Sequence, residues 1–285
     1  MSNVVVVGSY VQDMAFNTEV FPSPGETRIG EFTTNPGGKG FNQAVACNRL
    51  DTQTTFIGAV GDDAFGKVAS DFGAAEKINM ALQVIPNQAT AAAGIIVDKS
   101  AQNLIVVALG ANTYLSQEHI LEHQAVIQTA DVLVCQAECN LESTTLALQI
   151  AKKANTTTIL NTAPINEDMN ESLISHADII TPNETEFVFL MKHLRNIEVP
   201  GDFWTQSDQE IHDFCCQAGT PLVVLTLGDK GCFVSHNPTL NLRLGQNESP
   251  YYRLAARKVK TVDTTGAGDA FNGALAAGLV KHPGN

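Results

Sequence analysis

The fold class follows from Val262-Asp-Thr-Thr-Gly-Ala-Gly-Asp269, which is followed directly by AFNGALAAGLV. A strand-like segment, KVKTV, enters this glycine-rich turn, and a helical pattern leaves it. Gly266, Ala267 and Gly268 are small enough for backbone N–H groups to approach a ligand closely. At a helix start such N–H groups, aided by the helix dipole, form an anion site. The sequence therefore predicts an anion site at Gly266–Gly268, with Asp269 in the first helical turn.

An anion site beside a carboxylate suits phosphoryl transfer. The N–H groups would hold the moving phosphoryl group, and Asp269 would orient and deprotonate an alcohol. The alternative is an ordinary glycine-rich turn in which Asp269 only caps the helix. The turn taken alone leaves both interpretations open.

A second glycine-rich turn, Asn35-Pro-Gly-Gly-Lys-Gly-Phe-Asn42, also opens a helical pattern. Glycines on both sides of Lys39 invite close approach of the backbone to a ligand. Asn42 would face the same side as the helix start, where its amide suits a neutral polyol. Taken alone, this turn is a weak signal.

Short β-rich apolar runs alternate with helical patterns along the chain, which indicates βαβ units and a parallel sheet with helices on both faces. Strands are predicted at Val4–Val7, Thr54–Val60, Asp131–Gln136, Thr157–Leu160, Asp178–Thr181 and Leu222–Leu227. Helices are predicted at Gly40–Leu50, with Phe41, Ala44, Val45 and Leu50 on the apolar side, and at Ala64–Glu76, Glu142–Ala154 and Asp208–Cys216.

Two stretches, Val11–Asn35 and Ala89–Ala108, break this rhythm because neither contains a crossover helix. Both predict antiparallel strands added to the main sheet, as a small sheet that covers a cleft. We expect a single domain over residues 1–285, with the lid strands drawn from about 11–35 and 89–108.

The composition is that of a globular protein with an acidic surface. The 285 residues carry a net charge of −13, which disfavours nucleic acid and anionic lipid as partners. No apolar stretch approaches the roughly 18 residues of a membrane span, and the N-terminus lacks a signal-peptide pattern. The six cysteines contain no CxxC pair and form no disulfide framework, so a cytoplasmic protein is expected.

Two further motifs match known sites only in part. Gly61-Asp-Asp-Ala-Phe-Gly-Lys67 has P-loop spacing, but Val68 stands where a Mg²⁺-binding hydroxyl is required. His119-Ile-Leu-Glu-His123 matches the HxxEH pattern of inverted zinc proteases, with both histidines on one helix face. No further ligand is evident in the sequence, so an ordinary solvated helix is the favoured interpretation.

The two glycine turns together resemble the ribokinase-like (PfkB) carbohydrate kinases. GGKGFNQAVACNRL followed by VGDDAFG is similar to the first family signature, and DTTGAGDAFNGAL is similar to the second. Pieces between them match in order: Asp13 in GSYVQD, Glu138 in QAE, NTAP at Asn161–Pro164, TPNETE at Thr181–Glu186 and TLGDKG at Thr226–Gly231. The resemblance covers nearly the whole chain. It implies a three-layer αβα fold with a central, mostly parallel sheet and a small β-sheet lid.

The resemblance also implies an ATP-dependent sugar kinase that transfers the γ-phosphoryl group to a hydroxyl of ribose or a related sugar. Asp269 would be the base, and Gly266–Gly268 the anion hole. The residues expected around the sugar are Asp13, Gly38, Lys39, Asn42, Glu138 and Asp269. Those expected along the nucleotide are Lys39, Asn183, Thr226, Gly228 and Gly231.

The family likeness implies two kinds of ion. Glu186 would organise Mg²⁺ through water, and backbone oxygens of Asp263 and Thr265 would help to hold a monovalent cation such as K⁺. Separately, the two lid stretches have no helix to cover them, and an exposed sheet is usually covered or paired, so a homodimer that forms through the lid is expected. The alternatives are a kinase of the same fold for 2-deoxyribose, fructose or a nucleoside, and a sugar- or nucleotide-sensing protein without turnover.

Three departures from the family pattern affect the choice of sugar and the extent of the site. Val11 stands where members usually carry an asparagine that meets a sugar hydroxyl, which favours a sugar such as 2-deoxyribose. Phe41 replaces a small residue and is expected to crowd the sugar site. The sequence ends at Asn285, where members normally continue with another helix and a loop that help to wall the adenine and complete the cation site.

Overall fold

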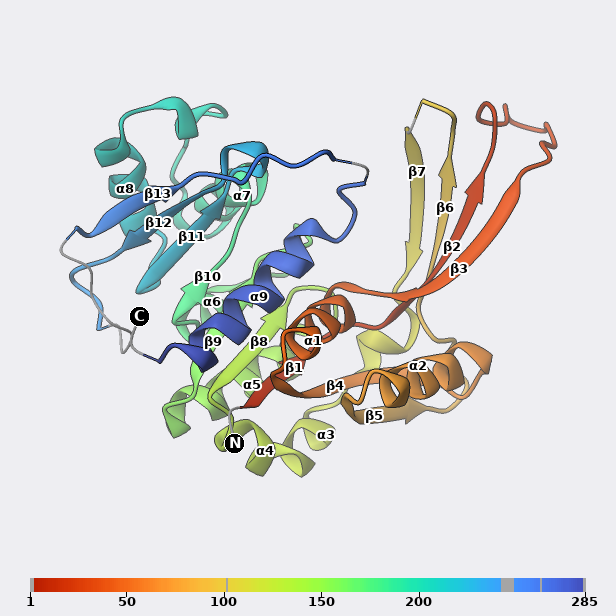
Figure 1. Ribbon diagram of the computed structural model, residues 1–285. Coiled ribbons are helices and arrows are strands. Elements are labelled where there is room, and N and C mark those ends of the chain that lie inside the picture. The colour runs from red at the N-terminus through yellow and green to blue at the C-terminus, as the bar shows by residue number, and fades with distance from the viewer. Residues whose placement is uncertain (1–2, 101, 242–248, 262, 284–285) are drawn as a thin grey trace.

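The computed structural model describes residues 3–100, 102–241, 249–261 and 263–283 (Figure 1). Val262 and Asn285, the first residue of the quoted turn and the last of the sequence, lie outside the described residues. The strands are β1 (Asn3–Val7), β2 (Val11–Asn17), β3 (Glu31–Gly37), β4 (Gln53–Gly61), β5 (Asn79–Ile85), β6 (Ala92–Val97), β7 (Asn103–Ala108), β8 (Val132–Gln136), β9 (Thr157–Asn161), β10 (Ile179–Ile180), β11 (Leu222–Thr226), β12 (Cys232–His236) and β13 (Tyr251–Leu254).

The helices alternate with these strands through most of the chain. They are α1 (Lys39–Arg49), α2 (Ala64–Ala75), α3 (Gln117–Glu122), α4 (Gln124–Gln128), α5 (Leu141–Ala154), α6 (Glu171–Ser175), α7 (Glu184–Arg195), α8 (Asp208–Cys216) and α9 (Ala267–Lys281), with 3-10 turns η1 (Gly110–Tyr114), η2 (Phe203–Thr205) and η3 (Gly228–Lys230). None of the described helices is long and apolar enough to cross a membrane.

Within the described residues, nine strands form the large sheet, in the order β13-β12-β11-β10-β9-β8-β1-β4-β5. The strands from β11 to β5 in this order are parallel, which confirms the predicted α/β architecture. At the other edge, β12 and β13 are antiparallel, and neither was predicted from the sequence.

Two apolar cores lie on opposite faces of the large sheet. The alternating valines of β1 show this division, because successive side chains of a strand point to opposite faces. Val4 and Val6 pack in the core with residues of α1, α2 and α9. Val5 and Val7 pack in the other core, with residues of helices α3 to α8. The sheet is therefore the middle layer of three, as expected.

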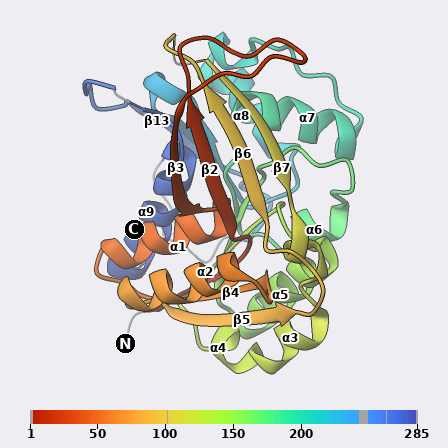
Figure 2. The same cartoon turned by 90° about the vertical axis from the view of Figure 1, so that its right-hand side faces the viewer.

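The small sheet consists of β3, β2, β6 and β7 in that order, and it stands away from the large sheet (Figures 1 and 2). The pairs β2–β3 and β6–β7 are antiparallel, but β2 and β6 are parallel. The small sheet expected from these two stretches is confirmed, but it is separate from the main sheet and its central pair is parallel, so the expectation of antiparallel strands added to the main sheet was wrong in those two respects. Both β2 and β6 run outward from the body, and β3 and β7 return, so the two outward strands pair in parallel.

Helices α1 and α9 pack against each other over one face of the large sheet (Figure 1). Gly273 permits this close approach, because a Cβ there would lie 2.5 Å from the Cβ of Ala46. The thiol of Cys47 also donates to the carbonyl oxygen of Gly273, at 3.3 Å. The helices meet side by side near their N-termini, which brings the two glycine-rich turns together.

One detail of the α1 prediction was wrong. Leu50 was expected on the apolar side of the helix, but it is 42% exposed. The helix ends at Arg49, and Leu50 is its C-cap, so Leu50 no longer follows the helical period. Cys47 is buried instead.

Candidate active site

The turn at the start of α9 leaves backbone N–H groups available to a ligand. Gly266 has φ 71°, a left-handed conformation that favours glycine, and no side chain caps the helix within the described residues. The N–H of Ala267 donates to the carbonyl of Thr264 at 3.1 Å. Gly268 follows in the first turn, where N–H groups lack intrahelical acceptors. Of the three predicted anion-hole residues, Gly268 is thus better placed than Ala267 to donate.

Asp269 is 9% exposed, and two amides hold its carboxylate. The side-chain amide of Asn42 donates to Oδ2 at 3.0 Å, and that of Gln43 donates to Oδ1 at 3.1 Å. Burial raises the pKa of Asp269, while these two hydrogen bonds and the charge of Lys39 oppose the rise. The carboxylate is therefore fixed in orientation by donors from α1, the other glycine-rich segment.

A chain of buried amides continues behind Asp269. Gln136 donates to Oε1 of Gln43 at 2.8 Å, and Gln43 also donates to Oδ1 of Asn161 at 3.2 Å. Neither Gln43 nor Gln136 was predicted from the sequence as a site residue. The available signal was a polar residue at a buried position of an otherwise apolar helix face, directly after Asn42.

The glycines before α1 allow two backbone segments to touch. Gly38 has φ 94°, and a Cβ there would lie 2.6 Å from the backbone nitrogen of Val11. A Cβ on Gly37 would lie 2.3 Å from Oδ2 of Asp13. The glycine motif thus makes room for the carboxylate of Asp13 beside the start of α1.

Three carboxylates surround this corner. Burial is the main reason that the pKa of Asp13 rises to about 6, and the charges of Glu138 and Asp269 add to the rise. Glu138 accepts hydrogen bonds through Oε2 from the N–H of Lys39 at 3.0 Å and the hydroxyl of Ser9 at 2.5 Å. Ser9 was not predicted. Such a negative, acceptor-rich corner suits the hydroxyl groups of a neutral polyol rather than an anion.

A cavity of about 190 Å³ lies between the glycine turn of α9, the start of α7 and Lys39, and the acidic corner of Asp13 and Glu138 is not part of its lining. Its lining combines one lysine, the glycine turn of α9, polar side chains and two carboxylates. The lining residues are Lys39, Asn161, Ala163, Thr181, Asn183, Glu186, Thr226, Thr264, Gly266, Ala267, Gly268, Asp269 and Asn272. The fold therefore gathers Lys39, Asn183, Thr226, Glu186 and the GAGD turn around one space, although they are distant in sequence.

Glu186 belongs to a capping box at the start of α7. Its Oε2 accepts from the N–H of Asn183 at 3.1 Å and from the hydroxyl of Thr162 at 3.2 Å, and its Oε1 accepts from the Asn183 amide at 2.9 Å. Burial raises the pKa of Glu186, and these hydrogen bonds oppose the rise. A carboxylate offers about four lone-pair positions, so three are already used. That leaves little room for direct coordination of an ion.

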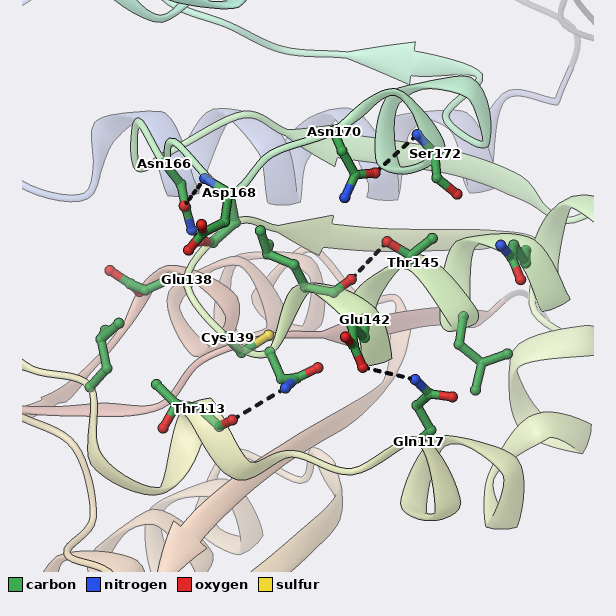
Figure 3. A pocket seen from close by; sticks show the side chains of 16 residues that line it. Thr113, Gln117, Glu138, Cys139, Glu142, Thr145, Asn166, Asp168, Asn170 and Ser172 are labelled. Carbon is green, nitrogen blue, oxygen red and sulfur yellow. Dashed lines mark hydrogen bonds between the residues drawn. The ribbon is translucent and has the colours of Figure 1, made fainter. Parts of the chain in front are cut away.

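A larger cavity, of about 710 Å³, opens beside Glu138 between η1, α5 and the segment before α6 (Figure 3). Hydroxyl, amide and carboxylate groups dominate its lining, and no lysine or arginine is among the described residues that line it. Several of these groups bond one another: Gln117 donates to Glu142 at 3.3 Å, and the Asp168 N–H donates to Asn166 at 2.8 Å. This cavity lacks the cations that phosphate groups require.

Comparison with known proteins identifies the family to which this chain belongs. The model of the pfkB family of carbohydrate kinases matches residues 1–284. The chain belongs to this family. It is an ATP-dependent carbohydrate kinase.

Relatives of this kinase are similar over nearly its whole length. The ribokinase of Haemophilus influenzae is 36% identical, with 98% of this chain and 85% of that protein covered. The deoxyribokinase of Salmonella typhi is 29% identical, with 96% and 84% covered. The structure of Arabidopsis thaliana ribokinase complexed with ribose and ATP has a TM-score of 0.80 at 26% identity, with 99% and 87% covered.

Some predicted site residues of the kinase lie outside the 190 Å³ cavity. Gly228 begins η3 and Gly231 follows it, and a Cβ on Gly231 would lie 1.9 Å from the carbonyl oxygen of Leu254, so Gly231 is required for packing against β13. Asp263 and Thr265 are exposed, and the Thr265 N–H donates to Oδ1 of Asp263 at 2.8 Å. This hydrogen bond lowers the pKa of Asp263.

Phe41 and Val11, the two residues near the sugar site that depart from the family pattern, have different surroundings. Phe41 is 1% exposed and packs against Tyr10 and Phe56, with ring centroids 5.3 and 5.4 Å apart. The expectation that Phe41 crowds the sugar site of the kinase was wrong, because this face of α1 turns toward the large sheet while Asn42 turns toward α9. Val11 begins β2 and is buried with Ala91 and Ala93.

Proposed function

We propose that this kinase phosphorylates a hydroxyl of ribose or a closely related sugar, with Asp269 as the general base. The observation that supports this most is the amide-held carboxylate of Asp269 in the wall of a cavity that also contains Lys39 and the glycine turn. A base next to an anion site is what transfer of a phosphoryl group to an alcohol requires. The names of the ribokinase relatives support ribose as the acceptor and ATP as the donor.

The nucleotide phosphates would lie in the 190 Å³ cavity, against Lys39, Gly268, Asn183 and Thr226. Lys39 supplies a positive charge, and the start of α9 adds N–H groups at the positive end of its dipole. Mg²⁺ would neutralise the phosphates and contact Glu186 through water, since the oxygens of Glu186 already accept three hydrogen bonds. Gly228 and Gly231 would serve the nucleotide by shaping the loop after β11.

The sugar would lie beside Asp13, Gly38, Asn42 and Glu138, on the acidic side of the site. Carboxylates accept hydrogen bonds from hydroxyl groups, so a neutral polyol satisfies this corner better than a phosphorylated one. The hydroxyl to be phosphorylated would point at Asp269. The cytoplasm is the proposed location, which is consistent with the cysteines of the described residues, since they are free thiols and most of them are buried.

The direct test is sugar-dependent ATP consumption by the purified protein with Mg²⁺. Ribose, 2-deoxyribose, fructose and a nucleoside are compared with a reaction that lacks an acceptor. We expect ribose or 2-deoxyribose to increase ADP formation well above that background. Tight binding of a sugar without any increase in ADP would instead support a sensor that has lost turnover.

A second candidate substrate, 2-deoxyribose, is favoured by Val11. The side chain is apolar and buried, so it cannot pair with a sugar hydroxyl, and an unpaired buried polar group costs about 1–3 kcal/mol. We expect 2-deoxyribose to have a kcat/KM equal to or above that of ribose, and Val11→Asn to shift the ratio toward ribose by up to about a hundredfold. The measurement is kcat/KM for both sugars on both proteins. A tenfold or greater preference for ribose that Val11→Asn leaves unchanged would overturn this candidate.

The small sheet would pair two chains into a homodimer. Its pairing registers place Phe32, Phe16, Ile96 and Leu104 in one row across all four strands, and the rings of Phe16 and Phe32 lie 5.0 Å apart. Phe16, Phe32 and Leu104 are about half exposed in the single chain. A sheet face this apolar is normally covered by another surface.

We therefore expect light scattering at micromolar concentration to give the mass of a dimer. The double variant Phe16→Glu/Phe32→Glu should give a monomer, because it places charges in the apolar row. Leu254→Glu, at an equally exposed leucine of β13, is the matched control and should remain dimeric. A monomeric wild-type protein would contradict the proposed pairing.

A further inference from the structure

Three potential metal ligands gather where α3 ends and α4 begins. Each of His119, Glu122 and His123 offers a ligand atom within 4.8 Å of the other two. Nδ1 of His119 lies 3.5 Å from Oε2 of Glu122, and the two imidazole centroids are 4.5 Å apart. We propose that these residues form a binding site for a late first-row divalent ion, Zn²⁺ in particular, separate from the kinase site.

Hydrogen bonds to backbone carbonyls set the tautomer of both histidines. Nε2 of His119 lies 3.1 Å from the carbonyl oxygen of Ala81, and Nδ1 of His123 lies 3.0 Å from that of His119. A carbonyl oxygen only accepts, so each of these nitrogens carries the proton. Nδ1 of His119 and Nε2 of His123 are then left with lone pairs. Histidine ligands of metals are held in this way, with the second nitrogen donating to a carbonyl or carboxylate.

One pair of the three ligand atoms has the spacing of a tetrahedral zinc site, and all three lie within 4.8 Å of one another. With bonds of about 2.0–2.1 Å, neighbouring ligand atoms of such a site lie about 3.4 Å apart. The pair formed by His119 and Glu122 already has this separation. Glu122 has a side chain that is 70% exposed, so it can turn toward an ion, whereas the buried ring of His119 is fixed by Ala81. Three protein ligands leave one position for water.

The helix that carries these ligands is tied to β5 at its start. The hydroxyl of Ser116 accepts from the His119 N–H at 3.1 Å, and the Ser116 N–H donates to Gln83 of β5 at 2.9 Å. Gln83 donates back to the Ser116 hydroxyl at 3.1 Å. His119 is thus held in place at two points, its backbone N–H and its imidazole ring. A ligand that is already in place loses little conformational entropy when an ion binds.

The ligand set selects the ion. Two imidazoles and one carboxylate suit Zn²⁺, Ni²⁺ or Cu²⁺, whereas Mg²⁺ and Ca²⁺ prefer oxygen ligands alone. Helix α3 lies at the end of the molecule opposite the small sheet, away from the start of α9 (Figures 1 and 2). The proposed site is therefore independent of the Mg²⁺ that accompanies ATP. The competing explanation is an ion pair in which a protonated His119 donates to Glu122.

Direct metal binding separates these explanations. The full chain, stripped with EDTA and kept reduced, is titrated with ZnCl₂ at neutral pH by calorimetry and equilibrium dialysis. We expect one ion per chain, unaffected by excess Mg²⁺. His123→Gln and Glu122→Gln should each weaken binding at least about tenfold, the lower range for disturbed metal sites. His176→Gln, which removes a partly buried histidine at the C-cap of α6, is the matched control and should bind as wild type does.

Thermal unfolding gives a second readout that does not depend on activity. Zinc at a hundredfold excess over its Kd should raise Tm by about 4–5 °C in a chain of this size. The rise should be absent in His123→Gln and present in His176→Gln, while turnover with Mg²⁺ and ATP stays unchanged in both. Absence of stoichiometric zinc in the wild type would overturn the proposal. Wild-type affinity in His123→Gln would also overturn it, since the ion would then be bound elsewhere, such as at cysteines.

Discussion

Asp269→Asn lowers kcat at least about a hundredfold while the protein still binds sugar, because a general base contributes about 10²–10⁴-fold. Asparagine keeps the size of the side chain but cannot accept the proton of the sugar hydroxyl. The carboxylate of Asp269 also accepts from Asn42 and Gln43, so the substitution leaves one amide donor facing another. Steady-state kinetics and a separate binding titration with the sugar measure the two effects.

The control for this variant is Asp71→Asn, which removes an exposed carboxylate paired with Lys67 on α2. It should turn over as wild type does. Burial raises the pKa of Asp269. As the solution is made more acidic, the rate should therefore begin to fall at a higher pH than it would with an ordinary aspartate as the base. Turnover of Asp269→Asn within a few-fold of wild type would exclude Asp269 as the base, but sugar-dependent ATP consumption by the wild type would stand.

Removal of divalent ions with EDTA abolishes turnover, and added Mg²⁺ restores it. The 190 Å³ cavity contains Lys39 but also the carboxylates of Glu186 and Asp269, so the charge of the ATP phosphates is not neutralised by the protein alone. Glu186→Gln should raise the Mg²⁺ concentration for half-maximal rate about tenfold or more, as loss of an outer-shell metal partner does. The measurement is the rate as a function of free Mg²⁺ at saturating ATP.

Glu184→Gln is the matched control, since it removes a carboxylate from the same first turn of α7 without altering the cavity lining. An unchanged Mg²⁺ requirement in Glu186→Gln would show that Glu186 acts only as the helix cap.

The monovalent cation site is checked in the same assay. If Asp263 and Thr265 help to bind a cation, K⁺ should stimulate more than Na⁺ at matched ionic strength.

The general architecture was predictable because it depends on local patterns. The alternation of apolar runs and helical patterns identified most of the parallel strands, and the bounds predicted for α8 agree with those observed. The strands β12 and β13 were missed. They form the antiparallel end of the large sheet. The edge strand β13 is only partly buried, and β12 is buried but short and ends in the polar residues Ser235 and His236, so neither has the continuous apolar run of a buried parallel strand.

The candidate site was predictable in part, because glycine turns and charged residues are visible in the sequence whereas their tertiary partners are not. The roles of Gln43 and Gln136 depend on a hydrogen bond across 93 residues, and although the polar Gln43 on an apolar helix face is visible in the sequence, its partner is not. The wrong expectation that Phe41 lies in the sugar site has the same origin. Residues 41 and 42 are adjacent in sequence, but α1 turns them to different sides, and only the packing of α9 shows which side meets the ligand.

The hydrogen bonds that hold Asp269 have a consequence for how turnover arises during folding. Its two donors lie 227 and 226 residues away along the chain, on α1. A partly folded chain that already contains α9 therefore has the carboxylate but not the donors that aim it. Catalytic activity should appear only after the two helices have docked, later than the recovery of helical signal. During refolding, the return of turnover would therefore mark the docking of α1 against α9, which brings together residues 227 positions apart, rather than the formation of secondary structure.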